Sequence, residues 1–174
     1  MAVRDESMAA NVKWILDQSK SARIVLSAHN FHVMKGPLNP NHPGPDDSMG
    51  AVLRKMYGNE LVTFGLVFHQ GSFRAMSMKG GMQTFTVGPS PMGSLEATLA
   101  ASGMSLFALD LRAAPKTGPA AEWLSIKRPT RNVMAGFSGD GPGSTIFEQV
   151  ATERYDCLLF VEKTTSVRSN PNPE

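Results

Sequence analysis

Two histidines, His29 and His32, stand three positions apart at the end of a short apolar run. The imidazole side chain titrates near neutral pH, so such a pair is suited to proton transfer or to stabilising an oxyanion through its N–H groups. The same pair could instead bind a metal ion or hydrogen-bond within the fold. These interpretations stay open at the level of the residues, and acid–base or oxyanion chemistry is the functional one that we develop.

A metal site would require more ligands than this pair supplies. A His-x-x-His pair is a weak metal signal, because zinc sites use three or four ligands. His42, Asp46 and Asp47 could add ligands only if the proline-rich segment that carries them folded back toward the pair. We therefore expect neither a metal ion nor another cofactor.

The residues around the histidine pair predict a strand before it and a loop after it. Residues 23–28 form an apolar, β-branched run that ends in polar residues, which indicates a buried strand. Open α/β sheets bind ligands at the carboxyl ends of their strands, where this run would deliver the histidines. Residues 33–47 contain four prolines, so we expect a loop, either a lid over the site or a surface insertion.

The first helix is predicted at residues 4–19, with one apolar face. Its apolar side chains repeat at helical spacing: Met8, Val12, Ile15 and Leu16. The charged residues, Asp5 among them, are expected mostly on the other faces, and the acidic first turn suits the helix dipole.

The rest of the chain alternates helical and strand patterns, which predicts an α/β fold. Residues 73–78 and 83–87 alternate apolar and polar side chains and predict an antiparallel hairpin added to the main sheet. Ser48 or a neighbouring aspartate is expected to cap one helix and Ser94 another. The expected helices are 4–19, 49–57, 95–102 and 120–124, and the expected strands are 23–28, 61–68, 73–78, 83–87, 105–110, 132–135 and 157–161.

Composition excludes several classes of protein. The 174 residues include 41% hydrophobic and 18% charged residues with a net charge of +2, values typical of one globular domain. The basic residues form no stripe, so we expect no nucleic-acid partner. No apolar run approaches the roughly 20 residues of a membrane span and the start lacks a signal core, so we expect a cytoplasmic protein with no membrane association.

Nucleophilic catalysis has little support in the sequence. Cys157 is the only cysteine, which rules out an internal disulfide, and it lies in an apolar run where we expect a buried thiol rather than a nucleophile. The segment 136–140 fails the Gly-x-Ser-x-Gly pattern at its last position, so a serine hydrolase of that type is disfavoured.

The stretch from Ile24 to Val33, IVLSAHNFHV, resembles the erythromycin esterase family, whose members carry an Ala-His-Asn-x-His-Val motif after an apolar strand. Further similarities follow in the same order along the chain, at residues 5–16, 48–54, 65–75, 91–96, 109–112 and 155–165. The resemblance therefore covers nearly the whole chain.

This resemblance implies a three-layer α/β/α fold with a mainly parallel sheet and a β-hairpin extension, partial relative to the full family fold. We expect residues 1–163 to form this domain and residues 164–174 to be a flexible tail. The implied reaction is hydrolysis of an ester by histidine-activated water, which in the antibiotic-resistance enzymes opens the macrolactone ring of a macrolide. His29 and His32 match the two histidines of the motif, with implied roles in positioning water or substrate and in stabilising the oxyanion.

The resemblance also implies that something is missing. Family members are longer, and their general-base histidine lies in an amino-terminal half, so this chain corresponds to the carboxyl-terminal portion. We expect an incomplete hydrolase for a small-molecule ester that pairs with an amino-terminal half or self-associates. The alternatives are a non-catalytic binding or interaction module of the same fold, and a metallohydrolase using His29, His32 and His42.

Overall fold

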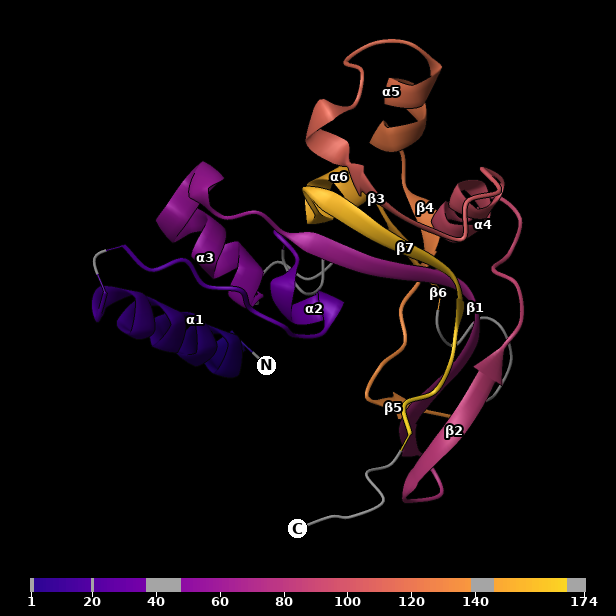
Figure 1. Cartoon of the computed structure of the whole chain (residues 1–174), viewed down its shortest axis with the longest axis horizontal. Helices are drawn as coiled ribbons and strands as arrows, with labels where there is room; N and C mark the ends of the chain where they lie inside the picture. The colour runs from indigo at the N-terminus through magenta and orange to yellow at the C-terminus, as the bar shows by residue number, and fades with distance from the viewer. Residues whose placement is uncertain (1, 20, 37–47, 139–145, 169–174) are drawn as a thin grey trace. The chain divides into compact units, whose positions relative to one another are not determined.

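The structure is a computed structural model that describes residues 2–19, 21–36, 48–138 and 146–168 (Figure 1). The chain divides into two compact units, each built from segments distant in sequence. Unit 1 comprises Met1–Gly65, Asp110–Ser125 and Ala151–Leu158, and unit 2 comprises Leu66–Leu109, Ile126–Val150 and Leu159–Glu174. Among the described residues, no helix combines the length and the hydrophobicity needed to cross a membrane.

Unit 1 is mainly helical. Its helices are α1 (Ala2–Asp17), α2 (Asn30–Val33), α3 (Met49–Tyr57), α5 (Pro119–Ser125) and α6 (Ala151–Arg154), with short 3₁₀ turns η1 (Gly58–Glu60) and η2 (Leu111–Ala113). Helices α1 and α3 pack together through a buried cluster of Ala9, Val12, Met49 and Leu53. The buried face of α1 differs from the prediction, because Ile15 is 50% exposed while Asp5 and Ala9 are fully buried.

Helix α3 begins and ends where the sequence predicts. The Ser48 hydroxyl accepts a hydrogen bond from the Ala51 N–H at 3.0 Å, which caps the helix, and Gly58 ends it. Gly50 allows close contact with α2, because a Cβ at this position would collide with the main-chain carbonyl of Val33. The short side chains at the start of α3 thus bring it directly against the segment that carries the histidines.

The predicted strand at residues 23–28 is wrong. Residues 22–29 have no regular secondary structure, and Val25 is 97% exposed. A strand is held by hydrogen bonds to a neighbouring strand, and no strand of the described part of the chain pairs with this segment. The local pattern indicated a strand, but its formation depends on a partner that the pattern cannot supply.

The main sheet lies largely in the segments of unit 2. Its strand order is β2 (Met82–Val87), β1 (Phe64–Ser77), β7 (Cys157–Thr164) and β3 (Leu106–Asp110), with β5 (Gly136–Phe137) pairing in parallel with β1. Strands β1 and β2 form the predicted antiparallel hairpin, in register from Gly71↔Val87 to Met76↔Met82. Helix α4 (Leu95–Ala100) follows the hairpin and is capped by the Ser94 hydroxyl, which accepts from the Ala97 N–H at 3.2 Å.

The α/β fold class with its hairpin extension is confirmed, and two strand boundaries differ. The predicted strands 61–68 and 73–78 form one strand, β1, in which Gly71 takes a positive φ of 123° and lies against the backbone of Thr164. The predicted strand 132–135 is wrong, because the strand is β4 (Arg128–Arg131), whose pairing with β6 (Ile146–Gln149) sets its position.

Two further predictions concern the last strand. Cys157 begins β7 and is buried as expected, and burial raises the pKa of its thiol, which favours the unreactive protonated form. Strand β7 extends to Thr164, and residues 169–174 of the predicted tail lie outside the described residues.

Candidate active site

His32 forms the centre of a hydrogen-bonded array in unit 1. Its Nδ1 lies 2.7 Å from Oδ1 of Asp5, and its side chain is 19% exposed while that of Asp5 is completely buried. The same Asp5 oxygen accepts the backbone N–H of Met49, the first residue of α3, at 3.1 Å. The array therefore joins α1, α2 and α3, and the amino-terminal end of α3 stabilises the negative charge of Asp5.

The partners of His32 define which ring nitrogen carries the proton. Nη2 of Arg4 lies 3.0 Å from Nε2 of His32. A guanidinium group can only donate and a carboxylate can only accept, so Nε2 accepts from Arg4 and Nδ1 donates to Asp5. This hydrogen-bond pattern places a proton on Nδ1 and makes Nε2 the acceptor atom of the ring.

The sequence analysis missed Asp5, although its spacing contained the signal. Asp5, Ala9 and Val12 follow one another at intervals of four and three residues, which places them on the same face of α1. All three are buried, and Oδ2 of Asp5 has no hydrogen-bond partner among the described residues. A carboxylate in line with the apolar face of a helix is the feature that could have identified it.

His29 accepts a hydrogen bond at the ring nitrogen from which His32 donates. It is the N-cap of α2, where its Nδ1 accepts the Phe31 N–H at 3.2 Å and its ring stacks on Phe31 with the centroids 5.6 Å apart. With Nδ1 accepting, the neutral ring carries its proton on Nε2 and can donate from that atom. His29 and His32 thus lie on one helical turn, one as a donor and the other as an acceptor.

Asp156 holds the segment that follows α2. Its carboxylate accepts hydrogen bonds from Lys35 Nζ at 2.9 Å, from the Thr63 N–H at 2.8 Å and from Arg54 Nη2. Burial opposes ionisation of Asp156, but these hydrogen bonds and the charges of Lys35 and Arg54 lower its pKa overall. The exit from α2 is further fixed by the Lys35 N–H, which donates to the Arg154 carbonyl at 2.8 Å.

The remaining candidate ligands of the sequence analysis lie outside the described residues. These are His42, Asp46 and Asp47. Within the part of the chain that the structure describes, no group of three or more histidine, cysteine, aspartate or glutamate side chains is arranged to hold a metal ion. The structure brings together His29 and His32 on α2 and adds Asp5 and Arg4 from α1.

Comparisons with known structures support the fold. A structure described as a succinoglycan biosynthesis protein matches with a TM-score of 0.76 and 25% identity over 92% of this chain and 38% of its own. A protein from Bacillus cereus matches with a TM-score of 0.78 and 23% identity over the same shares. A mutant of the erythromycin esterase EreC in its open conformation matches with a TM-score of 0.64 and 17% identity over 93% and 37%.

This chain therefore spans less than two fifths of the length of the structures that it matches. No curated protein matches it. The family model described as erythromycin esterase matches residues 1–164, which include the histidine motif and every helix and strand of the described residues. The chain belongs to the erythromycin esterase family.

Proposed function

We propose that this chain supplies the histidine pair of a hydrolase that cleaves small-molecule esters of the macrolactone type by histidine-assisted attack of water. The observation that carries the proposal is the 2.7 Å hydrogen bond between His32 Nδ1 and the buried Asp5 carboxylate, which directs Nε2 away from that carboxylate. A histidine fixed in this tautomer by a buried carboxylate can orient and polarise a water molecule.

The two histidines take different roles in this proposal. His32 accepts a hydrogen bond from the attacking water through Nε2, after the exposed Arg4 side chain has moved off that atom. His29 donates from Nε2 to the ester carbonyl oxygen as negative charge develops there. Asp5 is a positioning residue in this proposal, because it acts through its hydrogen bond to His32.

A further polypeptide segment completes the proposed site. The family resemblance implies a general-base histidine in an amino-terminal half, and the chain spans 38% of two of the matching structures. Residues 22–28 precede the histidines without a strand partner among the described residues, and Val25 is 97% exposed. An added strand that pairs with this segment would bury Val25 and bring the missing base to the histidines.

The test is ester hydrolysis by the purified chain, alone and together with the amino-terminal half of a full-length relative. The panel contains a macrolide lactone, a simple aryl ester and an acylated sugar, the last because one matching structure is named for succinoglycan biosynthesis. We expect hydrolysis in the complemented protein and a loss of about 100-fold or more in kcat for His32→Asn. His42→Ala is the control, since only a three-histidine metal site would lose activity with it.

Unchanged hydrolysis in the His29→Ala/His32→Ala variant would refute the assignment. The second candidate is a non-catalytic interaction module, which is favoured by the exposed Val25 and by the lack of a strand partner for residues 22–28 among the described residues. That module would bind the amino-terminal half with unchanged affinity in the double variant, and the complex would cleave no ester.

A further inference from the structure

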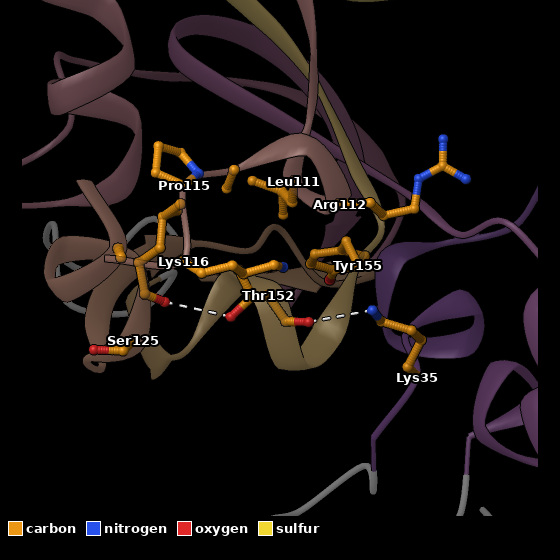
Figure 2. A pocket seen from close by; sticks show the side chains of 11 residues that line it. Lys35, Leu111, Arg112, Pro115, Lys116, Ser125, Thr152 and Tyr155 are labelled. Atoms are coloured by element: carbon orange, nitrogen blue, oxygen red, sulfur yellow. Dashed lines mark hydrogen bonds between the residues drawn. The ribbon is translucent and has the colours of Figure 1, made fainter. Parts of the chain in front are cut away.

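A cavity of unit 1 lies apart from the histidine array. It has a volume of about 360 Å³, within the range of small-molecule sites, and is formed by η2, α5, α6 and the residues next to them (Figure 2). None of Arg4, Asp5, His29 and His32 lines it. The cavity is therefore a separate feature whose chemistry is defined by its own lining.

The charged residues of the lining are all basic. Lys35, Arg112 and Lys116 line the cavity, and no acidic side chain does. Lys35 is anchored by Asp156 at 2.9 Å, and Arg112 by two hydrogen bonds of 2.9 and 2.7 Å to Asp110. Lys116 makes no ion pair with any described residue, so its charge is available to a ligand.

A buried donor without a partner lies in the same wall. Tyr155 is 1% exposed, and its hydroxyl has no hydrogen-bond partner among the described residues. Burial raises the pKa of Tyr155 to about 12, so the hydroxyl keeps its proton and remains a donor at neutral pH. A buried polar group without a partner is unfavourable, and a ligand oxygen placed here would accept the missing hydrogen bond.

The rest of the lining includes an apolar part. It consists of Leu111, Ala114, Pro115, Ala121 and Leu124. Figure 2 shows the Lys116 side chain extending toward Tyr155, with Leu111 and Pro115 beside them. A molecule that fits this lining has an anionic head for the cation and the hydroxyl and a hydrophobic body for the remaining wall.

We propose that this cavity binds a small organic carboxylate, with its head group paired with Lys116 and accepting the Tyr155 hydroxyl and its apolar body against Leu111 and Leu124. The Arg112 guanidinium adds positive potential at the rim, where its side chain is 53% exposed. The assignment does not depend on ester hydrolysis, because the cavity and the histidine array share no residue.

The probe is benzoate, titrated into the full 174-residue chain and followed by calorimetry or by NMR chemical shifts. Acetate carries the same head without the body, and benzyl alcohol carries the body without the charge. We expect saturable benzoate binding that is weakened about tenfold by Lys116→Gln and by Tyr155→Phe, each removing one charged or hydrogen-bonding contact. Lys79→Gln, at an exposed lysine of the hairpin turn, should leave the affinity unchanged.

Three results would overturn the proposal. The first is that benzoate shows no saturable binding with a dissociation constant below about 10 mM, which corresponds to a binding free energy of just under 3 kcal/mol. The second is binding that neither Lys116→Gln nor Tyr155→Phe weakens. The third is benzyl alcohol or acetate binding as tightly as benzoate, which would remove the need for the anionic head or for the apolar wall. His32→Asn should not change benzoate affinity, so failure of the hydrolase proposal leaves this test intact.

Discussion

Replacing Glu96 with glutamine should remove a decrease in the free energy of unfolding that occurs in the native protein as the pH rises. Glu96 lies on α4 in unit 2 and is completely buried. Its Oε1 accepts the Arg131 N–H at 2.8 Å, whereas its Oε2 has no hydrogen-bond partner among the described residues. Burial raises the pKa of Glu96 to about 7, because the hydrogen bonds and the Arg131 charge only partly offset the loss of hydration.

The sign and size of the effect follow from this pKa. Between the ordinary value of 4.5 and about 7, the folded protein keeps a proton on Glu96 that the unfolded chain releases. The contribution of Glu96 is therefore fully present below pH 4.5 and is lost as the pH rises through 7. A displacement of the pKa from 4.5 to about 7 corresponds to a loss of about 3 kcal/mol in the free energy of unfolding.

The measurement is urea denaturation of the native chain and of Glu96→Gln at several pH values from 4.5 to 8. The titration of His69 also changes stability with pH and must be subtracted. Burial and the charge of Arg131 lower the pKa of His69, so its contribution makes the free energy of unfolding increase with pH, opposite to that of Glu96. We therefore compare the two proteins at each pH. Their difference in unfolding free energy should move by about 3 kcal/mol in favour of glutamine, while any cost of the added amide stays independent of pH.

A difference that stays constant across this range would refute the reasoning. It would mean that Glu96 titrates alike in the folded and unfolded chains, so that the Arg131 guanidinium or water compensates for its burial. Thr98→Val is a suitable control, because it alters a neighbouring side chain of α4 without removing an ionisable group.

Three further predictions concern unit 1. Asp5→Ala removes the hydrogen-bond acceptor of His32 Nδ1 and of the Met49 N–H, so urea denaturation should show a free energy of unfolding lower by about 2 kcal/mol. An unchanged free energy of unfolding would contradict the described burial of this carboxylate. Gly50→Ala forces a methyl group into the Val33 carbonyl and should lower the melting temperature markedly, whereas Gly88→Ala, whose added Cβ meets nothing within 4 Å, should not. The lowered pKa of Asp156 contributes stability that is present above about pH 4 and is lost as the pH falls through the pKa of the folded protein. Asp156→Asn should therefore reduce the decrease in unfolding free energy that urea denaturation measures at acidic pH. An unchanged decrease would contradict this prediction.

Sequence periodicity and capping residues predicted the parts of the fold that depend on local interactions. Ser48 and Ser94 cap the helices expected after them, and the alternating segments around residues 73–87 form a hairpin. The two strands predicted at residues 61–68 and 73–78 are joined through Gly71, which permits the backbone of β1 to approach Thr164 within one continuous strand. That close approach involves Thr164 of β7, a strand far away in sequence, so the residues around Gly71 do not indicate it.

The sequence predicted only part of the candidate site, because the rest depends on contacts between residues that are distant in sequence. The motif identified His29 and His32, but the strand expected before them requires a partner that the described chain does not provide. The buried carboxylate was assigned to the dipole of α1 because charged side chains are usually exposed. Its burial becomes favourable only once the His32 ring and the Met49 N–H are both in place.

The tautomer of His32 therefore depends on contacts outside the histidine motif. The Ser48 hydroxyl donates to the Met34 carbonyl at 2.6 Å, which fixes the start of α3 against the end of α2. The Met49 N–H then meets Asp5, and Asp5 meets His32. Because these contacts form a closed circuit through α1, α2 and α3, the orientation of the ring is determined by the packing of the three helices. A sequence that kept the motif but lost Asp5 would retain both histidines without fixing the Nε2 lone pair that the proposed chemistry requires.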